Sequence, residues 1–179
     1  MKSVVLIGYP CAGKSTAMEG LEQIAETWET GDFVREMHEE EEGHKADSQS
    51  LGEWSTEKRE EDSAYATRAA INRIECTHGI HVFSGVRCMK EINLVRDSSE
   101  DTCVIYIDTS FEERFQRFSS RGREGEETRE ELKDRDERED GWGLEEILID
   151  EEYDYKVNGD LPEEELKNKV KELVKEHHL

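Results

Sequence analysis

The stretch GYPCAGKS at residues 8–15 has the spacing GxxxxGK(S/T), which is typical of a phosphate-binding loop. Its two glycines allow the backbone to pass close to a phosphate, with its NH groups directed at the anion. Lys14 would place an ammonium on the outer phosphates, and Ser15 would offer a hydroxyl to Mg²⁺. The motif therefore predicts a nucleoside triphosphate site built from Gly8, Cys11, Ala12, Gly13, Lys14, Ser15 and Thr16.

A second group of residues could take an acceptor phosphate. In TGDFVR (30–35), Asp32 and Arg35 are three positions apart at the expected start of a helix, so both would lie on one face. An arginine at such a place can hold a phosphate through two parallel hydrogen bonds. A surface ion pair with nearby glutamates is the alternative, and the spacing alone does not decide between the two.

Two strand ends are candidate positions for the carboxylate that would hold a metal-bound water. The run VIYID, which ends at Asp108, best fits an apolar strand followed by an acid. The run IHVFSG (80–85) fits better by position, but it has Ser84 where an acid is expected, and Gly85 and Arg87 follow. Turns at strand ends also favour Ser, Gly and Asp for structural reasons, so the sequence leaves both open.

Arginines recur between residues 114 and 138. Arg114, Arg117 and Arg121 share one stripe of an expected helix, beside an aromatic core stripe. Arginine suits phosphate and bases because its planar fork donates paired hydrogen bonds and stacks on rings. The alternative is an exposed helix held by weak Glu–Arg pairs, which we prefer for Arg129 and consider for Arg138.

Apolar runs separated by helical patterns predict the elements that would position these residues. Strands are expected at 2–7, 80–85, 103–108 and 153–159, with a short extended piece around residue 28. Helices are expected at 15–25, from 33 to the acidic run 39–42, and across 52–78 in one or two pieces, with a polar loop at 44–50. Further helices are expected after the capping boxes at 110 and 128 and from 160 onward. Strands joined by helical crossovers predict a mostly parallel α/β sheet with ligands at the carboxyl ends of its strands.

The composition limits the classes of partner. The 179 residues include 46 Asp and Glu against 24 Lys and Arg, which gives a net charge of −22. Such a surface repels duplex DNA and anionic lipid, so neither nucleic acid nor a membrane is expected as a partner. A solvated acidic surface suited to high salt is favoured over an acidic partner-binding surface.

Cysteine usage and length point to one intracellular domain. The four cysteines show no CxxC pair and no zinc-type histidine spacing, so a disulfide framework is not expected. The sequence has no apolar run of membrane-spanning length and no signal peptide pattern. We expect a reduced, cytoplasmic protein with one domain over 1–179.

Several segments resemble those of adenylate kinases. TGDFVR (30–35) resembles their acceptor-binding segment, FSGVR (83–87) their DGFPR-type segment, and RFSSR (117–121) the RxxxR that precedes their lid. YKVNG (155–159) resembles their last strand and adenine-side loop. Together with LGEWSTEKREE and RDERE, these segments make the chain similar to an archaeal family of adenylate-kinase-related P-loop proteins described as dephospho-CoA-kinase-like.

The resemblance implies a three-layer P-loop NTPase fold with a mostly parallel five-stranded sheet. It implies an acceptor-binding insert at about 31–78 and a short lid at about 121–140 within the single domain. Lys14 and Ser15 would hold the donor phosphates and Mg²⁺, and Asp32 would order metal-bound water.

The resemblance also implies roles for the arginines. Arg35 and Arg87 would grip the acceptor phosphate. Arg117 would lie against the donor base, near the loop at Gly159, and Arg121 would reach the donor phosphates. Arg135 and Arg138 would be the lid arginines. The chain departs from the family at Ser84, where the family usually has Asp.

We therefore expect a phosphotransferase that uses ATP and Mg²⁺ and transfers the γ-phosphoryl to a small nucleotide. A phosphate acceptor needs no strong general base, which agrees with an arginine-rich site. Two alternatives stay open: a dephospho-CoA-type kinase, with Asp32 as candidate base, and a nucleotide-binding switch or ATPase with little transfer, which Ser84 favours. A monomer is favoured, and the sequence does not fix the acceptor.

Overall fold

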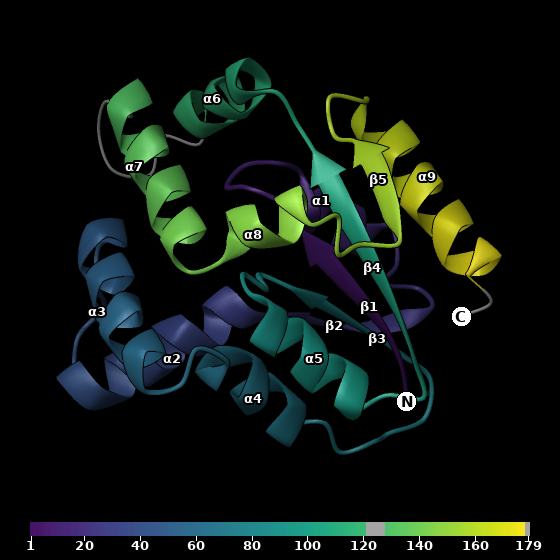
Figure 1. Ribbon diagram of the computed structural model, residues 1–179, viewed down its shortest axis with the longest axis horizontal. Helices are drawn as coiled ribbons and strands as arrows, with labels where there is room; N and C mark the ends of the chain where they lie inside the picture. Colours follow the sequence, from purple (N-terminus) through teal and green to yellow (C-terminus); the bar gives the residue numbers. More distant parts are fainter. Residues whose placement is uncertain (121–127, 178–179) are drawn as a thin grey trace.

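The computed structural model describes residues 1–120 and 128–177. Within these residues the strands form a five-stranded sheet in the order β2-β3-β1-β4-β5, and all four strand pairings are parallel (Figure 1). The strands are β1 (Lys2–Ile7), β2 (Ala25–Glu29), β3 (Ile80–Ser84), β4 (Asp101–Asp108) and β5 (Tyr155–Asn158). The predicted α/β class with a parallel five-stranded sheet is confirmed.

Helices connect the strands and cover both faces of the sheet (Figure 1). They are α1 (Lys14–Glu19), α2 (Thr30–Glu42), α3 (Ser48–Glu61), α4 (Tyr65–Asn72), α5 (Met89–Asp97), α6 (Phe111–Ser120), α7 (Arg129–Gly141), α8 (Leu144–Ile149) and α9 (Glu163–Glu176). The strand order reverses at β1, because β3 lies on one side of it and β4 on the other. Ligands of open α/β sheets bind at such a reversal, beyond the carboxyl ends of the strands.

The core consists of two apolar clusters, one on each face of the sheet. On one face, Leu6 and Ile105 pack with Ala17 of α1 and Val170 of α9. On the other face, residues of the sheet pack with helices α2, α4, α5 and α8, among them Val5, Phe83, Phe33, Ala70, Ile92 and Ile147. Full burial of each large aliphatic side chain is worth about 1.5–3 kcal/mol, so the two clusters fix where the strand ends lie.

Several predicted boundaries are wrong. α1 ends at Glu19 rather than near residue 25, because the chain turns and enters β2 at Ala25. α2 begins at Thr30, three residues earlier than predicted, where the Glu29 side chain accepts from the Gly31 N–H. The expected loop at 44–50 is helical from residue 48, where the Asp47 side chain caps α3.

The segment 52–78 is divided between α3 and α4, in agreement with the expectation of one or two pieces, but α4 ends at Asn72 rather than at 78. The capping box at Thr128 is confirmed, since its hydroxyl accepts from the Glu131 N–H while the Glu131 carboxylate accepts from the Thr128 N–H. α5 and α8 were not predicted by the sequence patterns.

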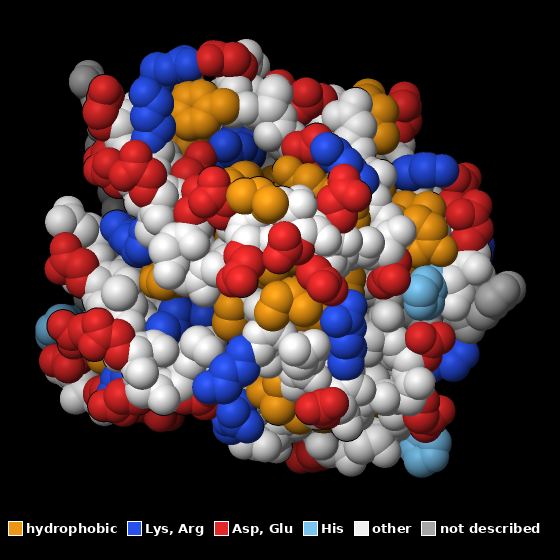
Figure 2. Space-filling model, viewed as in Figure 1, with side chains coloured by type: hydrophobic (Ala, Val, Ile, Leu, Met, Phe, Trp, Pro, Cys, Tyr) orange, Lys and Arg blue, Asp and Glu red, His pale blue; other side chains and the backbone are white. Residues whose placement is uncertain are grey.

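Acidic side chains are spread over the face shown in Figure 2, and apolar side chains reach the surface only in small groups between them. Ile24 and Ile149 are the large hydrophobic residues exposed among the described residues. None of the helices in residues 1–120 and 128–177 combines the length and the apolar character that crossing a bilayer requires.

Candidate active site

The phosphate-binding loop leaves the carboxyl end of β1 and enters α1. Gly8 has φ +144°, and a Cβ at this position would lie 2.6 Å from the carbonyl oxygen of Ile107, so a larger residue would displace the loop from β4. The buried Lys14 donates to the carbonyl oxygens of Gly8 at 2.6 Å and Tyr9 at 2.8 Å. The next residue, Ser15, is exposed at the start of α1.

Lys14 is electrostatically poised for an anion. Burial, reinforced by the nearby positive charge of Arg87, lowers the pKa of Lys14 to about 8. The carboxylates of Glu139 and Glu29 oppose this shift in pKa. A buried ammonium that has lost hydration gains strongly from a phosphate, because the anion restores its charged form.

The loop is bordered on one side by a cavity of about 480 Å³. Gly13, Thr16 and Arg117 line it, together with Leu166 of α9. The Arg117 guanidinium donates to Ala12 O at 3.2 Å and to Gly159 O at 2.7 Å. Arg117 therefore joins the phosphate-binding loop to the loop after β5.

A second cavity, of about 220 Å³, lies between the loop and the helices α2, α3 and α7. Its lining includes Pro10 of the phosphate-binding loop, Trp142, and the arginines Arg35, Arg59, Arg87, Arg135 and Arg138. In a chain of net charge −22, five arginines around one cavity form a local anion-attracting surface.

These arginines differ in their partners. Arg87 pairs with Glu139 of α7, with Nε at 2.8 Å from Oε2 and Nη2 at 3.0 Å from Oε1. Arg59 pairs with the fully buried Glu91 at 3.3 Å. Arg35 is exposed and pairs with Asp32 at 2.5 Å.

Arg135 and Arg138 of α7 have no acidic partner within the part of the chain that the structure describes, whereas Arg129 of the same helix pairs with Glu112. Arg135 lies over the Phe118 ring, 4.7 Å from its centroid, and Arg138 packs against Gly52 of α3. Their charges therefore remain available to an anion in the cavity.

Arg114 holds the surrounding elements together. It is 5% exposed and forms two hydrogen bonds of 2.8 Å with Asp136 of α7. It also donates to Pro10 O at 3.3 Å and lies over the Tyr9 ring. Sequence reasoning placed Arg114 on the arginine stripe but gave it no role; its burial shows that it anchors α6 and α7 to the phosphate-binding loop.

The candidate metal acids lie apart. Asp108 faces the opposite side of the sheet from α1, where it accepts from the Tyr106 hydroxyl and pairs with Lys156 at 2.8 Å. Asp32 is more than half exposed, pairs with Arg35 and does not line the arginine-rich cavity. Ser84 is fully buried, and its hydroxyl has no hydrogen-bond partner among the described residues.

Lys14, Arg35, Arg87 and Arg135 thus come together around the loop and the arginine-rich cavity. Arg117 lines the other cavity and donates to Gly159 O. Arg121 and Arg123 lie outside the described residues. The sequence analysis missed Arg59, Glu139 and Trp142, which line the arginine-rich cavity. Only the position of Trp142 between two glycines offered a signal for any of them.

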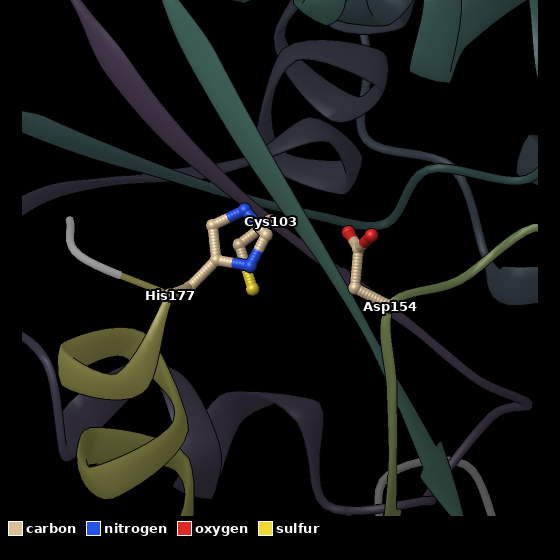
Figure 3. Close-up of side chains that lie close together, drawn as sticks. All are labelled: Cys103, Asp154 and His177. Carbon is tan, nitrogen blue, oxygen red and sulfur yellow. The ribbon is translucent and has the colours of Figure 1, made fainter.

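A separate cluster lies away from the loop, formed by Cys103 of β4, Asp154 before β5 and His177 after α9 (Figure 3). One potential ligand atom from each residue lies within 4.8 Å of the others. Burial and the charges of Asp154 and Asp101 raise the pKa of Cys103 to about 12, and Asp154 already accepts from the Val104 N–H at 2.7 Å. These features favour a protonated thiol rather than a metal-binding thiolate, so we assign no metal here.

Comparison with protein families gives a match over most of the chain. The family described as AAA domain matches residues 4–140. A UPF0200 protein of Methanoculleus marisnigri is 33% identical, over 97% of this chain and 96% of that protein. A UPF0200/UPF0201 protein of Archaeoglobus fulgidus is 32% identical over 97% of this chain, and the chain spans only 55% of that protein's length.

Solved structures share the fold at low sequence identity. A gluconokinase from Sinorhizobium meliloti has a TM-score of 0.62 and 16% identity, with 94% of this chain and 89% of that chain covered. Shikimate kinase from Aquifex aeolicus has a TM-score of 0.56 and 16% identity, with 98% of both chains covered. The fold is therefore that of P-loop kinases, and the chain belongs to the UPF0200 family of archaeal proteins, with a nucleotide-binding AAA domain.

Proposed function

We propose that the protein is a nucleotide kinase that transfers the γ-phosphoryl of ATP to a small nucleotide, in the manner of nucleoside monophosphate kinases. One observation carries the proposal: an arginine-lined cavity adjoins the phosphate-binding loop and is lined by different residues from the donor-side cavity. Arg87 of that cavity is near enough to lower the pKa of Lys14. Two phosphate groups could therefore meet between these side chains.

The arrangement suits direct transfer between phosphates. Phosphoryl transfer depends on positioning and on neutralising charge on the transferring group, and fixed cations serve both purposes. Lys14 would hold the donor phosphates, and Arg87, Arg135 and Arg138 would surround the acceptor phosphate. Ser15 would hold Mg²⁺, which would neutralise charge on the donor phosphates.

The acid that lines the cavity is already paired with an arginine, and this favours a phosphate acceptor over a hydroxyl acceptor. A hydroxyl would need a base to take its proton. Among the described residues that line the cavity, Glu139 is the acid, and it is engaged by Arg87. This is why we place the dephospho-CoA-type kinase behind the nucleoside monophosphate kinase.

The test is an acceptor panel with ATP labelled in the γ-phosphate. The protein is incubated with Mg²⁺ and with each nucleoside monophosphate, with dephospho-CoA, or with no acceptor, and labelled products are separated. We expect label in a nucleoside diphosphate. Label in CoA would replace the proposal by its hydroxyl-acceptor alternative, and label only in inorganic phosphate would indicate an ATPase or switch.

A further inference from the structure

The carboxyl ends of β2 and β3 place Glu29 beside Ser84. The two residues are register partners in the parallel pairing of these strands. Ser84 is also the partner of Leu6, which belongs to the cluster that packs against α1 and α9. Because side chains alternate along a strand and Trp28 and Phe83 face the opposite cluster, Glu29 and Ser84 face the side of α1.

Ser84 is poorly explained by the fold alone. It is fully buried at the end of β3, and its hydroxyl has no hydrogen-bond partner among the described residues. Such an orphaned polar group destabilises the fold unless a bound partner satisfies it. A buried hydroxyl on this side of the sheet suits a site where a bound water or ion would satisfy it.

The Glu29 side chain reaches across the end of β3. Gly85 has φ +88°, and a Cβ there would lie 2.5 Å from Glu29 Oε1, so the glycine leaves room for this carboxylate. Glu29 also accepts from the Gly31 N–H at 3.4 Å. Its negative charge acts on both Lys14 and Arg87, whose pKa values it raises, which places it within electrostatic reach of the loop.

We propose that Glu29 supplies the carboxylate that holds a water of the nucleotide-bound Mg²⁺, with Ser84 as a hydroxyl partner of the same water shell. The acid would thus lie at the end of β2, one strand away from the end of β3, where the sequence has Ser84 in place of the expected acid. The inference deepens the proposed function, because it rests on Mg²⁺–nucleotide binding at the loop. Ser15, the expected direct ligand of Mg²⁺, lies in the first turn of α1 on the same side of the sheet.

The competing acids are less well placed. Asp108 lies on the other face of the sheet and is tied to Lys156. Asp32 is exposed and paired with Arg35. Glu29 differs from both because no lysine or arginine forms an ion pair with it among the described residues, so its charge remains free to bind metal-bound water.

The experiment measures metal-linked nucleotide binding rather than activity. A non-hydrolysable ATP analogue is titrated by calorimetry in EDTA and in saturating Mg²⁺, and Mn²⁺ binding to the nucleotide complex is followed by electron paramagnetic resonance. Glu29→Gln keeps an oxygen for the Gly31 N–H, so α2 keeps its cap. The matched control is Glu26→Gln, which changes an exposed acid of β2 on the other face.

Loss of a group that orients metal ligands typically costs 10–100-fold in metal affinity. We expect Glu29→Gln to weaken Mn²⁺ binding by about tenfold or more and to reduce the gain in nucleotide affinity from Mg²⁺ by a similar factor. Nucleotide affinity in EDTA should change little, and Glu26→Gln should behave as wild type.

Unchanged metal affinity in Glu29→Gln, with nucleotide still bound in EDTA, would overturn the inference and leave the proposed function standing. Loss of metal affinity in Asp108→Asn but not in Glu29→Gln would overturn it in favour of the acid on β4. A wild-type protein that binds no nucleotide in either condition would instead refute the proposed function, on which the inference rests.

Discussion

At the scale of single residues, Lys14 is the clearest link between structure and function. Its pKa is lowered to about 8 by burial and by Arg87, so its ammonium is mostly charged at pH 7 and loses its proton as pH rises through about 8. A bound phosphate favours the charged form and raises the pKa again. Nucleotide binding above pH 8 must therefore be coupled to proton uptake.

We predict that nucleotide affinity is constant between pH 7 and 7.5 and falls by up to about tenfold per pH unit above pH 8, because free Lys14 must be protonated for binding. Calorimetry in two buffers with different ionisation enthalpies measures the uptake directly. The number of protons taken up should rise from near zero at pH 7 toward one at pH 9. Binding at pH 9 without proton uptake would show that Lys14 is already charged there.

Lys14→Ala should abolish transfer and keep the fold. Among the described residues, the ammonium contacts two loop carbonyls and has no carboxylate within hydrogen-bond distance. Loss of one transition-state charge contact typically costs ~3 kcal/mol, or about a hundredfold in turnover. Turnover and thermal unfolding are measured on the same preparation, and full activity in this variant would contradict a role in catalysis.

The cavity arginines should act on the acceptor and not on ATP. Arg35→Ala is suitable because Arg35 is exposed and its removal leaves no buried charge unpaired. We expect weaker acceptor binding by about tenfold, since one charge-assisted hydrogen bond is worth about 1.5–3 kcal/mol before solvent exposure reduces it. Arg68→Ala, an exposed arginine of α4 outside the cavity, is the control. Reduced ATP binding with unchanged acceptor binding would reverse the assignment of the two sides.

Single residues also show what the sequence could predict. Lys14 and Ser15 were identifiable because the motif fixes their order along the chain. Arg59, Glu139 and Glu29 were not, because each gains its position from a contact with another element: Glu91, Arg87 and the end of β3 respectively. Nothing in local spacing distinguishes these residues from the many charged residues of the surface.

At the scale of elements, α7 connects the two sides of the site. Asp140 of α7 accepts from the Tyr9 hydroxyl of the phosphate-binding loop, and the Trp142 indole after α7 donates to Thr56 of α3. In Figure 1, α7 lies between α6 and α3. An anion that binds Arg135 or Arg138 would therefore be held by an element already anchored to the loop.

Two ion pairs join α6 to α7, and they should differ in strength. Arg114–Asp136 is buried, whereas Glu112–Arg129 is exposed. Removing one partner of a buried pair leaves an uncompensated charge and costs about 3–5 kcal/mol. We predict that Asp136→Ala lowers the free energy of unfolding by about that amount in urea titrations. Glu112→Ala is the matched control and should have a much smaller effect, so equal losses would refute the anchoring role of Arg114.

The strand ends make a further prediction about Ser84. Because Glu29 lies beside it, Ser84→Asp would bury a second carboxylate next to the first, and like charges in a buried site disfavour each other. We expect a lower unfolding temperature at pH 7 and no stronger Mg²⁺ dependence than wild type. A variant with unchanged stability and tighter Mg²⁺ dependence would show instead that β3 is the natural place for the acid.

At the scale of the whole molecule, the sheet was predictable and its helical cover only in part. Alternating apolar runs and helical patterns were sufficient to predict parallel strands, and β1, β3 and β4 lie close to the predicted ranges. α5 and α8 were missed because they are too short to show a clear helical pattern, although they carry apolar residues such as Ile92 of α5 and Ile147 of α8. Their burial comes from packing on a sheet whose position local sequence does not give.

The net charge determines how the stability of the fold should depend on salt. Even if each of the 24 Lys and Arg residues neutralised one carboxylate, 22 of the 46 acidic side chains would remain unbalanced. Their mutual repulsion disfavours the compact state, and salt shortens its range from about 10 Å at 0.1 M to about 3 Å at 1 M. We predict that the unfolding temperature rises steadily between 0.05 and 2 M KCl, whereas nucleotide affinity falls as the same ions screen Lys14 and the cavity arginines.

Sucrose at matched osmolality is the control for solvent exclusion, because it stabilises compact proteins without screening charge. An unfolding temperature that rises equally in sucrose, or that is independent of KCl, would mean that the acidic residues are spaced widely enough on the surface for water alone to suppress their repulsion.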